Sequence, residues 1–142
     1  MVKQPSISNA AAIAACNAIV DKVDDPGGDQ GRLRIYGGTQ PADTDTPVTS
    51  QPLLVDFQLP WPAFGNAQDA SPKAVAVANS IPNVVAVGSG TATWFRVVTK
   101  SGVAVFDGNV GVVDEDCIVD NTTVQAGQTV QVLAIKYHVR ET

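Results

Sequence analysis

One short stretch constrains the fold more than any other part of the chain: residues 91–107, with the sequence TATWFRVVTKSGVAVFD. β-Branched and aromatic residues alternate with period two around Lys100-Ser101-Gly102, as they do in half-buried strands. Gly102 can take the positive φ that a short hairpin turn requires. The stretch therefore predicts a β-hairpin, and it carries no candidate catalytic group. One face of its first strand should hold Phe95 and Val97, and the other Trp94, Arg96 and Val98.

The same alternation predicts four more strands, at residues 32–36, 54–59, 73–78 and 129–140. In the first of them, Leu33 and Ile35 should face inward, and Arg32, Arg34 and Tyr36 outward. In the last, the parity of the apolar residues changes near Val132, which predicts a β-bulge or a bend. The glycine pair of Gly88-Ser89-Gly90 lacks the lysine and the spacing of a phosphate-binding loop, so it predicts a turn.

A helix is predicted from Asn9 to Val23, with Ser6 or Ser8 as its N-cap. It should end at Asp24-Asp25-Pro26-Gly27-Gly28, where proline and glycine interrupt helical geometry. The residues before Cys16 also match the end of a lipoprotein signal peptide, but polar residues interrupt the apolar region that such a peptide needs. We therefore expect a helix that packs on its own sheet or on a neighbouring subunit. Its apolar face should hold Ile13, Cys16, Ile19 or Val20, and Val23.

Many short strands, polar turns and a single initial helix predict a mainly β protein, specifically an antiparallel β-sandwich of the jelly-roll type. A length of 142 residues fits one domain. We expect residues 1–28 to form the helix and a linker that pack on the body or on a neighbour. Residues 29–142 should form a single β-sandwich domain.

Two loops are candidates for contacts with other molecules. Gly37 to Pro52 has very few apolar residues, and loops of this length are often functional. Pro60 to Gly65 holds Trp61 and Phe64 between prolines that restrict the backbone. The two aromatic side chains could cap one end of the core. Alternatively, they could bind another protein at a low entropic cost.

Composition limits the classes of partner. Charged residues make up 16% of the chain, below the ~25% typical of soluble proteins, and a surface with few charges costs little to desolvate on docking. The net charge of −5 repels phosphate groups, so we expect no nucleic acid as partner. No apolar run approaches the ~20 residues that span a bilayer, so we expect no membrane either.

The residues that could carry chemistry are few. The single histidine, His138, shares the polar parity of the last strand with Lys136 and Arg140, which predicts a solvated side chain. Cys16 and Cys117 lack the spacing of a redox or zinc motif and predict buried free thiols, with a disulfide as the alternative. The acidic run 114–116 lacks the ligand spacing of a calcium loop. We therefore expect no enzyme, no metal and no cofactor, although a carboxylate pair for hydrolysis remains the open alternative.

Five sequence motifs occur along the chain in a distinctive order: LRIYGGTQPAD at 33–43, PAFG at 62–65, SGTATWFRVV at 89–98, VFDGNVG at 105–111 and VQAGQTVQV at 124–132. Together they resemble a widespread family of small proteins of tailed bacteriophages and prophages. Its members open with an alanine-rich helix and continue with the same strand and turn motifs in the same order, over nearly the whole chain. The present chain departs from them in a longer acidic segment at Val113 to Asp120 and in its final KYHVRET.

The resemblance implies a non-enzymatic virion component, foremost a decoration or cement protein that stabilises the capsid lattice at capsomer junctions. A neck, tail or fibre protein, or a glycan- or receptor-binding module, is the alternative. The implied partners are the major capsid protein and copies of the chain itself, arranged as a trimer. The implied location is the outer capsid surface, and the host cytoplasm before assembly. The residues expected at protein interfaces are Ile13, Tyr36, Gln40, Pro41, Trp61 and Phe64.

Overall fold

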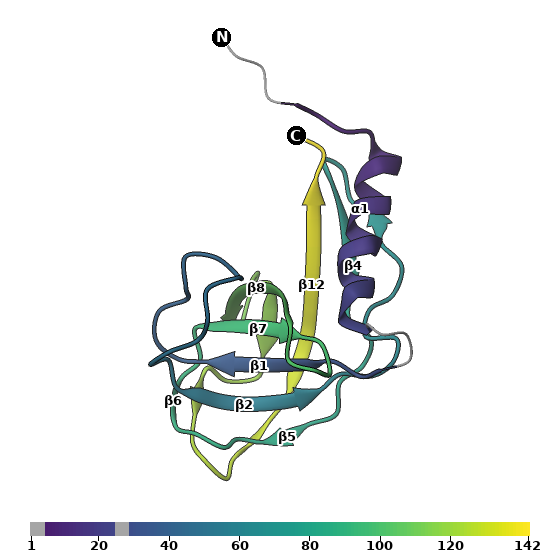
Figure 1. The fold of residues 1–142 in the computed structure, drawn as a ribbon. Coiled ribbons are helices and arrows are strands. Elements are labelled where there is room, and N and C mark those ends of the chain that lie inside the picture. Colours follow the sequence, from purple (N-terminus) through teal and green to yellow (C-terminus); the bar gives the residue numbers. More distant parts are fainter. Residues whose placement is uncertain (1–4, 25–28) are drawn as a thin grey trace.

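The computed structural model describes residues 5–24 and 29–142, and it shows a mainly β protein with one N-terminal helix (Figure 1). Eight strands form one sheet in the order β2-β1-β7-β8-β9-β12-β4-β3. Their bounds are β1 Arg32–Tyr36, β2 Leu53–Gln58, β3 Gln68–Asp69, β4 Lys73–Val77, β7 Trp94–Val98, β8 Ala104–Gly111, β9 Cys117–Val119 and β12 Val132–Arg140. Two further ladders pair β5 (Val84–Val85) with β11 (Thr129–Val130), and β6 (Gly90–Thr91) with β10 (Thr123–Val124).

The predicted hairpin is confirmed as β7 and β8, which pair antiparallel and lie in the middle of the sheet. Gly102 has a φ of +92° in the turn, the left-handed conformation that glycine adopts without a steric penalty. All five residues of β7 are buried. A strand buried on both faces needs a cover on each, and the second cover is the loop of residues 37–52 described below.

The large sheet is mixed, so the antiparallel part of the prediction is wrong, and a jelly-roll sandwich is not confirmed. Strands β8 and β9 run parallel, with Val110 opposite Cys117. The sequence did not predict this parallel pair, because a connection as short as residues 112–116 usually joins antiparallel strands. Strands β1, β2 and β7 cross the direction of β12, so the sheet turns sharply between its two ends (Figure 1). The body also closes on itself, because the Val87 N–H donates to the Leu54 carbonyl at 2.8 Å and ties the chain after β5 to β2.

The predicted helix is confirmed as α1 (Asn9–Asp21), followed by one 3₁₀ turn, η1 (Lys22–Asp24). Ser8 is the N-cap, and its hydroxyl oxygen accepts from the Ala11 N–H at 3.1 Å. The helix lies along β4 and β12 of its own chain (Figure 1). Cys16, Val20 and Val23 are buried as predicted, whereas Ile13 and Ile19 are half-buried and Ala12 is fully buried instead. The proline and glycines predicted to end the helix lie outside the described residues.

Strand β4 packs with the face opposite to its valines. Ala74 and Ala76 are fully buried, while Val77 is 50% exposed. Small side chains let the helix approach the sheet closely, so the alanines rather than the larger valines lie beneath α1.

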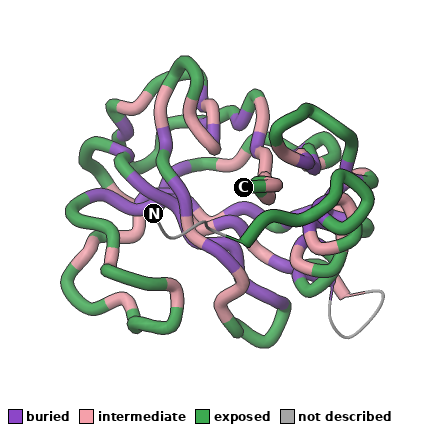
Figure 2. The backbone as a smooth tube through the Cα atoms, turned by 90° about the horizontal axis from the view of Figure 1, so that it is seen from above, coloured by how far each residue is buried: buried purple, intermediate pink, exposed green. Residues whose placement is uncertain are grey.

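The predicted change of parity in the last strand is confirmed. The pairing of β12 with β9 shifts register between Val132 and Ala134, as a bulge does. Leu133 is the residue left between them, and it is 57% exposed while Ile135 is fully buried. Figure 2 shows the buried residues concentrated along the strands, with exposed residues in the surrounding loops.

Candidate interaction surface

A buried ion pair lies at the centre of the sheet, where β7 and β8 pair. Arg96 is directly opposite Asp107 in the register, and its Nε and Nη2 donate to the two carboxylate oxygens at 2.7 and 2.9 Å. Only 6% of the Arg96 side chain and 3% of the Asp107 side chain are exposed. The hydrogen bond to Asp107 raises the pKa of Arg96, so the guanidinium is charged throughout the accessible pH range.

The remaining donors of Arg96 hold the loop of residues 37–52. Its Nη1 donates to the Thr46 carbonyl at 2.9 Å, and its Nη2 to the Asp43 carbonyl at 3.4 Å. Nearby, the indole N–H of Trp94 donates to the Gly37 carbonyl at 3.2 Å, and the Thr93 hydroxyl to the Gly38 carbonyl at 2.7 Å. We call these four groups on Thr93, Trp94, Arg96 and Asp107 the loop clamp.

Aromatic packing completes the loop clamp. The Tyr36 ring stacks on Trp94 with centroids 4.6 Å apart, and the Arg96 guanidinium lies 5.6 Å from the centroid of the Trp94 ring. Such contacts of a guanidinium with an indole are favourable. Tyr36 is therefore buried, only 6% exposed, although it lies on the outward parity that the alternation predicts. Its role is to support Trp94, and its ring is covered.

The loop also holds its own shape. The Asp43 carboxylate accepts from the Thr46 N–H at 2.9 Å and from the Thr46 hydroxyl at 2.8 Å. The Gln51 amide donates to the Thr39 carbonyl at 2.9 Å. The loop is thus a defined surface feature, and on it Gln40 is exposed and Pro41 half-buried.

The second predicted contact loop, Pro60 to Gly65, has one aromatic side chain on the surface and one in the core. Trp61 is 58% exposed, as a residue that meets a partner would be. Phe64 is 5% exposed and packs edge-on against Phe106, with ring centroids 6.0 Å apart. The expectation that Phe64 lies at an interface is therefore corrected, because its ring is part of the core.

The initial helix holds this aromatic loop in place. The Asp24 carboxylate accepts from the Ala63 N–H at 3.2 Å, and the Asn17 side chain accepts from the Ala67 N–H at 2.7 Å. Asp24 is 9% exposed, and burial raises the pKa of its carboxyl group. Ile13, the predicted contact residue of the helix, is half-buried and packs against the core. Of the six predicted residues, Gln40 and Trp61 are thus exposed, Ile13 and Pro41 are half-buried, and Tyr36 and Phe64 are buried.

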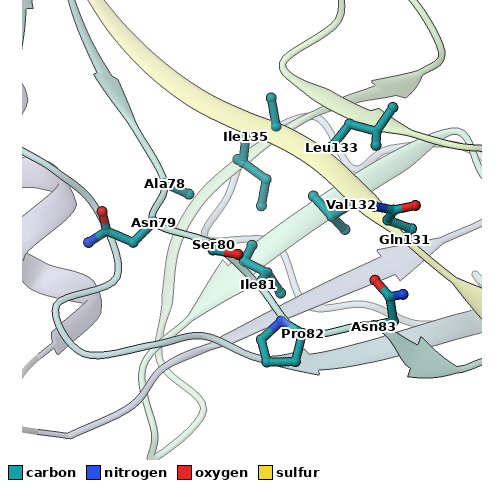
Figure 3. Close-up of a pocket in the computed structure, with 11 residues that line it drawn as sticks. Ala78, Asn79, Ser80, Ile81, Pro82, Asn83, Gln131, Val132, Leu133 and Ile135 are labelled. Atoms are coloured by element: carbon teal, nitrogen blue, oxygen red, sulfur yellow. The ribbon is translucent and has the colours of Figure 1, made fainter.

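A groove of about 520 Å³ lies between the segment 78–83 and the bulged part of β12 (Figure 3). Leu133 lies at its rim beside Gln131, and Ile81, Pro82 and Asn83 form the opposite wall (Figure 3). The side chains that line it are aliphatic or neutral polar, and none of them is aromatic or ionisable. The groove therefore offers shape and hydrogen bonds, and the one hydroxyl in its lining, that of Ser80, has no ionisable side chain of the lining to act as its general base.

The predicted chemistry-bearing residues lie apart from this groove. His138 is half-buried in β12, opposite Val75 of β4. Cys16 and Cys117 are both buried and free, which confirms the prediction of free thiols. Burial raises the pKa of the Cys117 thiol to about 12 and also raises that of Cys16. Across residues 5–24 and 29–142, no three His, Cys, Asp or Glu side chains are grouped as a metal site would require.

The reasoning from sequence missed the loop clamp. A signal was present: Arg96 stands in an otherwise apolar strand, and Asp107 follows in the partner strand at a spacing that the hairpin turn makes pairable. Alternation alone places Arg96 on an exposed face, because it does not register that a distant loop covers that face.

In the part of the chain that is described, no helix is long and apolar enough to cross a membrane. Comparisons with known protein families, with curated protein sequences and with solved structures find no match to this chain.

Proposed function

We propose that this chain is a non-enzymatic structural component of a tailed-phage virion, and specifically a decoration protein that stabilises the capsid lattice at capsomer junctions. The proposal starts from the resemblance of its sequence motifs to small phage and prophage proteins. Its surface would then act by contact with the major capsid protein and with other copies of the chain.

One observation supports the proposal more than the others: the sequence motifs that carry the resemblance contribute the residues of the loop clamp and of its aromatic packing. Tyr36 comes from LRIYGGTQPAD, Trp94 and Arg96 from SGTATWFRVV, and Asp107 from VFDGNVG. Together these residues hold the loop of residues 37–52, which contains the QPA of the same family motif. A rigid, presented loop binds a partner with little loss of conformational entropy. The residues that define the resemblance thus serve to present this loop.

The groove gives further support to a role in contacts. Its lining carries neutral side chains only, and the exposed Leu133 stands at its rim. A glycan-binding module of a fibre would be expected to offer aromatic platforms, and this lining has none. The groove itself therefore gives no support to the glycan-binding alternative.

The test is the amount and position of the chain in purified virions from a strain that encodes it. Quantitative mass spectrometry should find it in a fixed ratio to the major capsid protein, and a reconstruction should place it on the head. A few copies per particle would instead indicate a neck, tail or fibre protein. Absence from the particle would overturn the proposal.

A matched pair of variants connects this test to the loop. Gln40→Ala with Pro41→Ala changes presented loop residues, and Val85→Thr changes an exposed residue of β5. The first should reduce incorporation into virions, and the second should leave it unchanged. Equal incorporation of both would remove the loop from the proposed contact.

A further inference from the structure

The strands β4 and β12 have one face that the described chain covers only in part: Val77 and Arg140 are exposed, and the other residues of this face are half-buried. Directly opposite residues of paired strands lie on the same face. Ala74 and Ala76 pair with Val139 and Tyr137 on the face that packs under α1 and against the core. The other face carries three opposing pairs, Lys73 with Arg140, Val75 with His138, and Val77 with Lys136. We call this the open basic face.

The charge of the open basic face is unusual in a chain with a net charge of −5. Arg32, Arg34, Arg96 and Lys100 each have a carboxylate partner. In the described part of the chain, Lys73, Lys136 and Arg140 have no ion pair. Within residues 5–24 and 29–142, these three cations therefore lie together on one face, beside the chain's single histidine.

The register makes this arrangement costly in the isolated chain. Arg140 and Lys73 are Cα partners, and like charges directly opposite each other on two strands repel. A local arrangement that opposes stability without a compensating contact usually belongs to a functional surface. Acidic side chains from outside the chain would remove the repulsion.

The same molecule presents a surface with the complementary character. The turn after β8 carries Asp114 and Glu115, and its Val112 and Val113 are 53% and 67% exposed. On the open basic face, Val77 is 50% exposed and lies beside the cations. Each surface thus combines exposed valine with one sign of charge. The two surfaces adjoin, because the Lys136 N–H donates to the Asp116 carbonyl at 2.9 Å, and both residues border one small cleft.

We propose that the open basic face binds the acidic turn of residues 112–116 of a second copy, in a two-fold dimer. A two-fold axis beside Lys136 and Asp116 would place each basic face on the partner's turn, so both contacts form at once. Exposed valines would lie against each other in the contact, and the Lys73–Arg140 repulsion would be relieved. This proposal rests on charge and register alone and does not depend on a role in a virion.

The experiment is a charge swap followed by sedimentation velocity on the full chain. The basic-face variant is Lys73→Glu with Arg140→Glu, and the turn variant is Asp114→Lys with Glu115→Lys. Each alone should weaken dimerisation by at least about 10-fold, because every contact then opposes like charges. An equimolar mixture of the two should associate again, since each acidic face then meets a basic turn. High salt should weaken the wild-type dimer through screening.

The control variant is Arg32→Glu with Lys100→Glu, which changes the net charge as the basic-face variant does but on other strands and turns. Its dimer should be unaffected, and circular dichroism checks that every variant is folded. A monomer at all concentrations, or a mixture that fails to associate, would overturn the proposal. A trimer would overturn the two-fold arrangement. Binding of heparin by a chain that stays monomeric would show that the face recognises polyanions instead.

Discussion

Replacing Arg96 by methionine should destabilise the protein and loosen a loop that lies far from it in the sequence. The methionine keeps much of the volume but leaves the Asp107 carboxylate, of which 3% is exposed, without its cation. Removing one partner of a buried ion pair costs about 3–5 kcal/mol of the free energy of unfolding. The carbonyls of Asp43 and Thr46 also lose the guanidinium donor, so two of the hydrogen bonds that hold the loop disappear.

The free energy of unfolding is measured by urea denaturation, and the loop by hydrogen exchange of its amides. Arg32→Met is the matched control, because Arg32 pairs with Asp56 at 3.3 Å but its side chain is 41% exposed. An exposed ion pair contributes only about 0–1 kcal/mol. Exchange in residues 39–50 should accelerate in Arg96→Met and stay unchanged in Arg32→Met.

A second variant separates the lost ion pair from the unpaired carboxylate. Arg96→Met with Asp107→Leu removes both charges, and apolar replacement of a whole buried pair is often neutral or stabilising. It should therefore recover part of the lost stability, while the loop stays loosened because its carbonyls still lack the donor. Equal stabilities of Arg96→Met and Arg32→Met, or unchanged loop exchange, would refute the reasoning.

Three further predictions concern the core, the thiols and the helix end. Phe106→Ala should cost about 3–5 kcal/mol, because Phe106 is 5% exposed and packs on three aromatic rings; Trp61→Ala, at an exposed position, should stay within about 1 kcal/mol in the same denaturation assay. Cys16 and Cys117 should resist a thiol reagent at pH 8 until urea is added, because burial raises the pKa of both thiols; rapid labelling of the native protein would contradict their burial. Burial raises the pKa of Asp24, so the stability that its protonated carboxyl contributes is fully present below the unfolded-state pKa and is lost as pH rises through the folded-state pKa. Asp24→Asn keeps the hydrogen-bond acceptor but cannot ionise, so it should gain stability relative to wild type between pH 3.5 and pH 7. An equal difference in the free energy of unfolding at both pH values would contradict this.

Local patterns in the sequence predicted the elements well. The hairpin around Gly102, the helix that begins after Ser8 and the bulge near Val132 all follow from short-range chemistry. A turn that needs positive φ, a hydroxyl that caps a helix and a change of apolar parity act within a few residues. Each could therefore be read without knowledge of the rest of the chain.

The candidate site was predicted less completely, because exposure depends on what covers a face. Tyr36 stands on the parity predicted to face outward, but its ring is buried against Trp94, and Arg96 is buried beneath the loop of residues 37–52. Phe64 sits in a loop with Trp61, yet only Trp61 is exposed, since the Phe64 ring packs on Phe106. Because the two aromatic residues are close in sequence, both were predicted to lie at an interface; tertiary packing buries one of them and leaves the other exposed.

The sequence by itself determined that the chain is mainly β, where its hairpin, helix and bulge lie, and that its net charge is negative, because these properties depend on neighbouring residues or on simple sums. Only the tertiary structure decided that β8 and β9 run parallel, that Arg96 holds a distant loop, and that three cations share one partly covered face. Those outcomes depend on pairing and covering between segments far apart in the chain, and the alternation within one strand carries no information about them.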